Sequence, residues 1–126
     1  MILLDTNALL FWTLDSKALS KKAADAIADA ETVSISSISI WEIGIKVKRG
    51  KLTIPLTIRE YAAQLNLLEG FKILPVDEAA WMKNIELDWE NRDPADRTIV
   101  ATAEILSCPL VSSDITVRSF YPNTIW

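Results

Sequence analysis

Histidine is absent from the 126 residues of this chain, and its absence excludes several kinds of catalysis. Without histidine there is no Ser-His-Asp triad, no Cys-His pair and none of the usual zinc sites. Any catalysis therefore depends on carboxylates, hydroxyls, lysine, arginine or a metal ion. If a metal takes part, the hard oxygen ligands that remain favour Mg²⁺ or Mn²⁺.

Cysteine and long apolar runs are also scarce. The single cysteine, Cys108, excludes an intrachain disulfide framework. No apolar stretch approaches the length that spans a bilayer, so we expect no membrane association. The first residues lack a cationic region and Asp5 interrupts their apolar run, which is not the pattern of a secretory signal. Together these features predict a cytoplasmic protein.

The residues that are present can build a sizeable core, because 50% of them are hydrophobic. A length of 126 residues suits a single domain, residues 1–126, with one core. The net charge of -4 argues against a protein that works mainly through a basic surface. It does not exclude nucleic acid, because acids at a metal site lower the net charge while basic residues line its rim.

Short apolar runs alternate with helical stretches along the chain. The runs suited to strands are residues 2–4, 33–36, 72–74, 110–112 and 124–125. Five signals indicate helix starts. Ser20 and Asp77 are candidate N-caps, and Asp93 with Pro94 forms an Asp-Pro pair typical of a helix start. Two capping boxes are also present, Ser39 with Glu42 and Thr57 with Glu60. The alternation predicts an α/β fold with a central, mostly parallel β-sheet flanked by α-helices on both faces.

Two of the predicted strands end in aspartate. Asp5 follows residues 2–4, and Asp114 follows residues 110–112. The carboxyl ends of parallel strands form the edge where α/β proteins bind ligands, so adjacent strands of this kind would hold two acids close together. Close acids repel unless a cation lies between them. The pattern therefore predicts a divalent-metal site, with the Thr6 hydroxyl and the Asn7 amide as polar support.

Two further acids, Glu42 and Asp96, are expected in the first turns of helices. Each of the four acids also has a simpler interpretation. Asp5 and Asp114 could cap turns, Glu42 could complete its capping box, and Asp96 could favour the helix dipole. The joint pattern, more than any single residue, favours convergence on one edge of the sheet.

Basic residues lie near two of these acids. Those that follow Glu42 are Lys46, Lys48, Arg49 and Lys51. They form either a solvated helix end or a rim that contacts phosphates. Arg97, next to Asp96, is expected at the surface or as an ion-pair partner of that acid.

These segments, taken together, resemble the PIN-domain ribonucleases, and among them the VapC-type toxins of bacterial toxin–antitoxin pairs. The resemblance covers nearly the whole chain. It rests on residues 4–7 (LDTN), 37–43 (SISIWEI), 92–97 (RDPADR) and 110–114 (LVSSD), with residues 124–126 similar to the closing strand. Their order and spacing carry the resemblance, because each motif alone is common.

The resemblance implies a PIN-like fold, a Mg²⁺- or Mn²⁺-dependent endoribonuclease, a homodimer, and inhibition by a cognate antitoxin protein. It also implies that the acids that bind the metal and catalyse the reaction are Asp5, Glu42, Asp96 and Asp114. Asp93 is implied as an outer or additional acid, and Thr6 as the polar position after the first acid. The chain departs from many relatives at Ser113, where they carry a basic residue before the last acid.

Three other functions compete with this interpretation. An aspartyl-phosphate phosphatase would use Asp5 as nucleophile, but its pattern has a second acid two positions on, where this chain has Asn7. A response-regulator-like receiver would need an adjacent acidic pair near the N-terminus, which is missing. A non-catalytic α/β module that binds a metal or a protein is the third, and metal titration would separate it from an enzyme.

Overall fold

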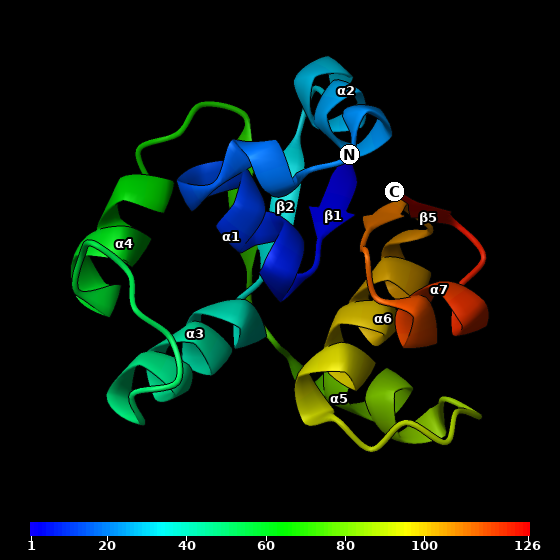
Figure 1. The fold of residues 1–126 in the computed structure, drawn as a ribbon. Helices are drawn as coiled ribbons and strands as arrows, with labels where there is room; N and C mark the ends of the chain where they lie inside the picture. The colour runs from blue at the N-terminus through cyan, green and yellow to red at the C-terminus, as the bar shows by residue number, and fades with distance from the viewer.

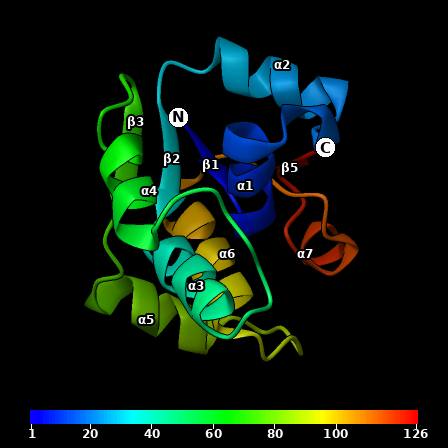
Figure 2. The ribbon, with the colours of Figure 1, turned by 60° about the vertical axis from the view of Figure 1, so that its left-hand side comes forward.

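Five short parallel strands form one sheet. The computed structural model describes all of residues 1–126. The strands are β1 (Ile2–Leu4), β2 (Val33–Ser36), β3 (Phe71–Leu74), β4 (Leu110–Val111) and β5 (Thr124–Ile125), in the order β3-β2-β1-β4-β5 (Figures 1 and 2). Every neighbouring pair is parallel, which confirms the predicted fold class. Two bounds differ by one residue from the sequence prediction, since β3 begins at Phe71 and β4 ends at Val111.

Helices connect the strands and cover the sheet. They are α1 (Thr6–Leu14), α2 (Lys21–Asp29), α3 (Ile38–Lys48), α4 (Ile58–Leu65), α5 (Glu78–Glu86), α6 (Pro94–Leu106) and α7 (Ile115–Phe120), with a 3₁₀ turn η1 at Ser16–Ala18. The predicted N-caps Ser20, Thr57, Asp77 and Asp93 are confirmed, because each side chain accepts a hydrogen bond from a backbone N–H of its helix. None of these helices has the length and apolar character needed to cross a membrane.

The predicted capping box of Ser39 and Glu42 is wrong. Helix α3 begins at Ile38 after Ser37, which makes no side-chain capping bond. Ser39 therefore lies inside the first turn, where its buried hydroxyl pairs with the Thr6 hydroxyl at 2.9 Å. Because Ile38 packs into the core, the helix begins earlier in the chain than predicted. The Thr6 hydroxyl then replaces Glu42 as the partner of Ser39. As a result Glu42 lies beyond the first turn of α3.

The sheet separates two hydrophobic cores. Along β1, Ile2 and Leu4 point into the first core and Leu3 into the second, as the two-residue period of a strand requires. Helices α1, α2 and α4 cover the first core, and α6 and α7 cover the second, with α5 packed on α6 (Figure 1). Helix α3 contributes Ile43 to the first core and Ile38 to the second. It thus spans both faces at the carboxyl edge of the sheet.

The strand order reverses at β1, in the middle of the sheet. The chain passes from β1 outward to β2 and β3, then returns to the other side of β1 to form β4 and β5. The crevice at the carboxyl ends of β1 and β4 is the switch point where open α/β sheets bind ligands. Asp5 directly follows β1 at this point, and Asp114 follows β4 by three residues.

Candidate active site

A polar cavity of about 170 Å³ lies at this switch point. It has no hydrophobic lining residue, and the residues around it are Asp5, Thr6, Asn7, Glu42, Lys46, Asp93, Asp96 and Asp114. The four acids predicted from the sequence are all among them. They come from the beginnings of α1, α6 and α7 and from α3, so helices far apart in the sequence meet around one space.

Asp5 and Asp114 reach the cavity as helix caps. The Oδ1 atom of Asp5 accepts a hydrogen bond from the N–H of Ala8 at 2.8 Å, and it caps α1. The Oδ1 atom of Asp114 accepts one from the N–H of Thr116 at 2.8 Å, and it caps α7. Asp5 and Asp114 are therefore helix caps and also line the cavity. Each cap orients its carboxylate with one oxygen.

Asp96 lies in the first turn of α6, as predicted. Its N–H donates to Oδ1 of Asp93 at 2.9 Å, and its own Oδ2 accepts from the Asn91 side-chain amide at 3.0 Å. The Asn91 Oδ1 atom in turn accepts from the N–H of Asp93 at 2.9 Å. Sequence analysis did not single out Asn91, because it lies in an irregular segment where no periodicity marks which face a side chain takes.

Glu42 and Lys46 lie one turn apart on α3 and form an ion pair at 3.6 Å. The Glu42 side chain is 17% exposed and that of Lys46 is 45% exposed, so the cation covers the acid on its solvent side. Of the predicted basic rim, only Lys46 lines the cavity. Lys48, Arg49 and Lys51 are exposed at and beyond the end of α3, outside the cavity.

Hydroxyl groups brace the cavity from the sheet side. The Thr6–Ser39 pair joins the starts of α1 and α3. Ser112 is fully buried after β4, and its Oγ accepts from the N–H of Asp114 at 3.1 Å. Ser113, the position of the family departure, does not line the cavity. Ser39 and Ser112 were missed in this role, although their position after apolar strand runs is the signal that could have identified them.

Arg97 is half-buried and does not pair with Asp96. Its guanidinium turns away from the cavity and donates to the backbone carbonyls of Asn84, Leu87, Trp89 and Asn91. The expectation of an ion pair with Asp96 is therefore wrong. Carbonyls in the last turn of α5 and in the segment that leads to α6 have no ladder partners, and a partly buried guanidinium with five N–H donors satisfies them.

The electrostatics of Asp5 reflect its confinement. Burial raises the pKa of its carboxyl group to about 6. The Ser112 side chain and the N–H of Ala8 act in the opposite direction, and the nearby charges of Asp114 and Glu42 raise the pKa further. The ionised form of Asp5 is thus held in surroundings that disfavour it.

Asp96 is perturbed in the same direction. Burial raises its pKa to about 6, the Asn91 amide opposes the rise, and the neighbouring acids, Asp93 first, add to it. Two carboxyl groups of one cavity therefore resist ionisation for the same two reasons. A cation placed between them would stabilise both ionised carboxylates and lower the pKa of each.

The donor set fits a hydrated divalent cation. No three carboxylates are arranged as a ready-made metal cage. Mg²⁺ does not need one, because it usually retains several waters and takes only one or two protein carboxylates. The cavity supplies carboxylate, hydroxyl and amide oxygens and no sulfur or imidazole. That chemistry matches Mg²⁺ or Mn²⁺ and does not match zinc.

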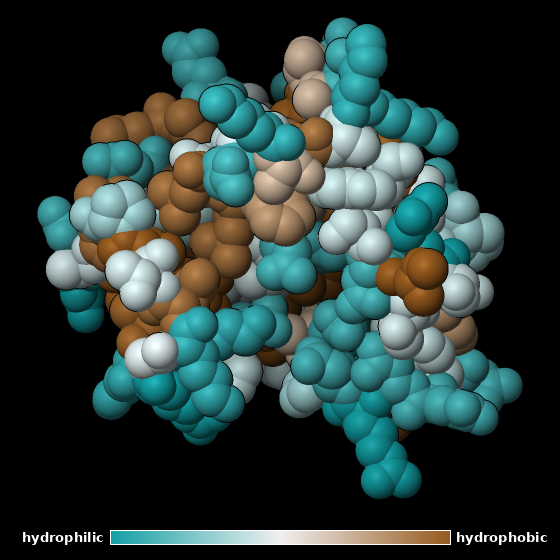
Figure 3. Space-filling view, viewed as in Figure 1, coloured by the Kyte–Doolittle hydropathy of each residue, from teal (hydrophilic) through white to brown (hydrophobic).

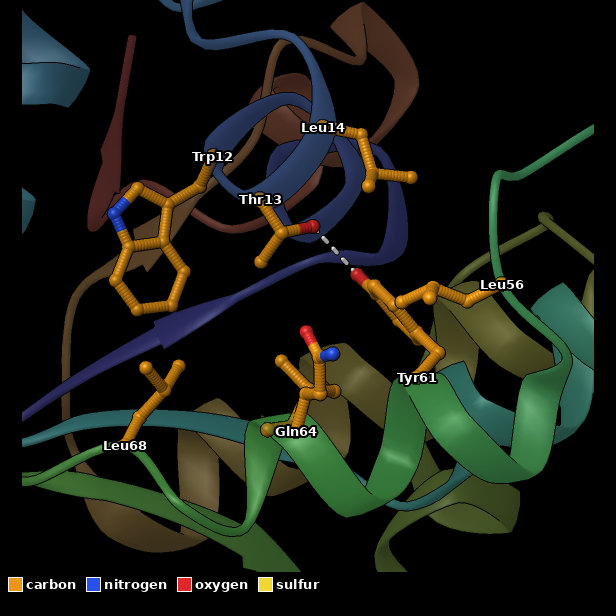
Figure 4. Close-up of a pocket in the computed structure, with 8 residues that line it drawn as sticks. Trp12, Thr13, Leu14, Leu56, Tyr61, Gln64 and Leu68 are labelled. Carbon is orange, nitrogen blue, oxygen red and sulfur yellow. Dashed lines mark hydrogen bonds between the residues drawn. The ribbon is translucent and has the colours of Figure 1, made fainter.

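A second cavity, of about 260 Å³, lies between α1 and α4 and differs in character (Figure 4). Its lining is mostly hydrophobic, and in the space-filling view brown side chains gather on the left, over α1 and α4 (Figure 3). The one polar pair drawn across it is satisfied internally, since Thr13 Oγ1 and Tyr61 Oη lie 2.6 Å apart. No carboxylate lines this cavity, and nothing in it provides acid–base or metal chemistry.

A parallel sheet of order β3-β2-β1-β4-β5 with an acid-lined cavity at its switch point defines the class of this protein. It is an α/β protein with several carboxylates at the edge of the sheet where such folds bind ligands. The chain belongs to the PIN domain family, whose family model matches residues 2–121.

Individual relatives agree with this assignment. Ribonuclease VapC22 of Mycobacterium tuberculosis is 26% identical over 129 residues, which covers 99% of this chain and 98% of the relative. A toxin–antitoxin complex from Klebsiella pneumoniae has the same fold, with a TM-score of 0.69, 18% identity and coverage of 100% of this chain and 97% of the other. VapC20 of M. tuberculosis, described as a toxin that cleaves the sarcin-ricin loop, matches with a TM-score of 0.67, 18% identity and 94% of both chains.

Proposed function

We propose that this protein is an endoribonuclease and the toxin of a bacterial toxin–antitoxin pair. The observation that carries the proposal is the single cavity in which four acids from separate segments meet. Membership of the PIN domain family and similarity to a protein named as a ribonuclease support it. Residues 1–126 act as one domain in this proposal, because both ends of the chain contribute acids. An RNA substrate places the activity in the cytoplasm.

The proposed cofactor is Mg²⁺ or Mn²⁺, held among Asp5, Glu42, Asp96 and Asp114, one or two of them directly and the others through retained water, with Asp93 as an outer acid. When bound, such a cation supplies charge stabilisation to a phosphodiester and to the departing 3′-oxygen, and makes water nucleophilic at neutral pH. The Thr6 hydroxyl braces the first acid's helix through Ser39. Asn7, exposed at the cavity wall, is free to bind the ribose or the phosphate.

Lys46 is the residue best placed to position the RNA backbone. It lies at the cavity on the solvent side of Glu42, so a phosphate that approaches the acids meets its ammonium group. Lys48, Arg49 and Lys51 continue from it as exposed cations. We propose that they contact phosphates further along the strand, where such contacts fix register without reading sequence.

The test of the proposed activity is cleavage of RNA by the purified protein. We expect cleavage with Mg²⁺ or Mn²⁺, loss of cleavage in EDTA, and recovery when metal is restored in excess. Asp25→Asn serves as the matched control, because Asp25 is an exposed acid on α2 paired only with Lys21. Undiminished cleavage in EDTA would exclude the metal-dependent function.

The proposed inhibitor is an antitoxin segment that complements the charges of the cavity. A partner that presents Arg or Lys to Asp5 and Asp96, and a carboxylate to Lys46, would match both signs of charge. The Klebsiella pneumoniae structure is itself a toxin–antitoxin complex, which supports a protein partner. A co-complex in which the partner touches only surfaces remote from all four acids would refute this mode of inhibition.

The proposed assembly is a homodimer. Exposed apolar side chains on α5, at Trp81, Met82 and Ile85, provide surface that an interface would bury. Light scattering coupled to size exclusion should give twice the 14.1 kDa chain mass. A monomer at micromolar concentration would contradict this part of the proposal.

A further inference from the structure

The Arg97 side chain uses its whole guanidinium to hold the last turn of α5 and the segment that leads from it to α6. Nη1 donates to the carbonyls of Trp89 at 2.6 Å and Asn91 at 3.0 Å. Nη2 donates to the carbonyls of Asn84 at 2.6 Å and Leu87 at 2.9 Å. Nε completes the set with Oδ1 of Asn84 at 3.4 Å. One planar group thereby fixes four carbonyls, one in the last turn of α5 and three in the irregular segment that follows it.

The two ends of that segment are held by different means. Near α5, Leu87 is buried in the second core and the Trp89 ring stacks on Phe120 with centroids 4.6 Å apart. Asn91 has no such apolar anchor. Its carbonyl is held by Arg97, and its Oδ1 accepts from the N–H of Asp93. Loss of the guanidinium fork would therefore free the segment mainly at Asn91.

Asn91 is the link from this segment to the acid cavity. Its amide is the only hydrogen-bond donor within the chain that reaches the Asp96 carboxylate, at 3.0 Å. Arg97 directly follows Asp96 in α6, so one helical turn carries both the acid and the group that holds the acid's partner. We propose that Arg97 is a positioning residue that fixes Asn91, and that Asn91 in turn holds the Asp96 carboxylate in place in the cavity.

The proposal makes a specific demand on side-chain type. A lysine at this position would keep the positive charge, but its compact ammonium group cannot span four carbonyls as a planar fork does. Asn84 strengthens the clamp from α5, because its Oδ1 accepts from Arg97 while its Nδ2 donates to Thr98 Oγ1 at 2.9 Å. Charge alone should not substitute for this geometry.

The first experiment measures the affinity for Mn²⁺ by isothermal titration calorimetry, and it rests on the proposed metal-dependent function. Arg97→Lys and Asn91→Ala should each weaken binding about 10–100-fold, the usual effect of losing a partner that orients a ligand. The matched control is Arg92→Lys, since Arg92 is exposed in the same segment and makes no hydrogen bond or ion pair. The double variant should bind no more weakly than the weaker single one, because Arg97 acts through Asn91. The proposal would be overturned if the loss of Mn²⁺ affinity in the double variant equalled the product of the two single losses. Unchanged binding in Asn91→Ala would also overturn it.

The second experiment is independent of metal. Water exchange of the Asn91 side-chain amide, measured by NMR, should be slow in the parent and in Arg92→Lys, and fast in Arg97→Lys and Asp96→Ala. If Arg97→Lys does not fold, Asn84→Ala takes its place with a smaller acceleration expected. If the Asn91 amide exchanges as slowly in Arg97→Lys, or in Asn84→Ala where that variant is used, as in the parent, the inference is overturned. A parent that binds no Mn²⁺ but shows this exchange pattern would refute the metal function and leave the positioning role intact.

Discussion

Helix α1 has a cavity at each end, and the two differ in how their polar groups are satisfied. At its start, Asp5 and Thr6 face a space lined only by polar and charged side chains. At its end, Trp12 and Leu14 line an apolar space in which Thr13 and Tyr61 satisfy each other. The first cavity brings several negative charges close together. In the second, the polar pair is hydrogen-bonded and no like charges face each other.

This difference separates what stabilises the fold from what the fold is used for. Stability alone would favour the arrangement at the end of α1, where the polar pair is complete. Burial and neighbouring acids raise the pKa of both Asp5 and Asp96 to about 6, so their ionised forms lower the free energy of unfolding. Local conflicts of this kind are expected at functional sites and rarely elsewhere.

The largest expected effect is on cleavage. Asp5→Asn and Asp96→Asn each remove one charge at nearly constant volume, and each should reduce RNA cleavage at least about 100-fold, the upper end of what losing a mere supporting group causes. Circular dichroism should show that the fold survives. Cleavage at the parental rate by either folded variant would remove that acid from the proposed site.

The next effect is on stability in the presence of metal. Mg²⁺ binds the folded cavity and has little affinity for dispersed acids, so it should add roughly 2.7 kcal/mol at a hundredfold excess over Kd. Asp96→Asn should match or exceed the parent's melting temperature without metal and respond less to Mg²⁺. If Asp96 served only as a first-turn acid, its loss would instead lower stability by roughly 0.3–1 kcal/mol with no metal response in either protein. Thermal melts at constant ionic strength distinguish the two.

A third effect depends on pH in EDTA. The folded protein holds the Asp5 proton up to about pH 6, whereas the unfolded chain releases it near 3.8. The folded state therefore binds more protons between these values, and the contribution of Asp5 to stability falls as pH rises through them and is constant above. The free energy of unfolding of Asp5→Asn, measured relative to that of the parent, should therefore rise by on the order of 2 kcal/mol between pH 4 and pH 7. A difference that does not change with pH, in urea melts, would contradict the burial of this charge.

The smallest effect belongs to the apolar cavity. Tyr61→Phe removes one hydroxyl, and Thr13 Oγ1 keeps its bond to the Leu9 carbonyl at 2.8 Å. The free energy of unfolding should fall by about 0.5–1.5 kcal/mol. RNA cleavage and the Mg²⁺ response should stay unchanged. A loss of either would show that the two ends of α1 are not independent.

The parts of the site that could be predicted lie where chain geometry is regular. Asp5 and Asp114 follow short apolar runs, and parallel strands bring their ends together whatever the surrounding detail. Asp96 was placed correctly because an Asp-Pro pair marks the helix start two residues before it. Caps and strand ends are local signals, and the structure retains them.

The parts that could not be predicted depend on tertiary partners. Ser39 had a plausible local partner in Glu42, but the distant Thr6 hydroxyl took its place. Arg97 stood beside an acid, yet it bonds to carbonyls of a segment without periodicity. Asn91 carries no sequence signal, and its role depends on Arg97 holding its backbone. Only the packed fold determines which of several available partners each polar group takes.

The most direct test of the central claim is to locate the cation. Crystals grown with Mn²⁺, measured at a wavelength where manganese scatters anomalously, should show a peak inside the cavity formed by Asp5, Asp96 and Asp114, within coordination distance of at least one of these carboxylates. The same crystals of Asp96→Asn should show a weaker peak. No peak in the cavity, or a peak only elsewhere, at Mn²⁺ concentrations that support RNA cleavage would contradict the claim that these acids form the metal centre.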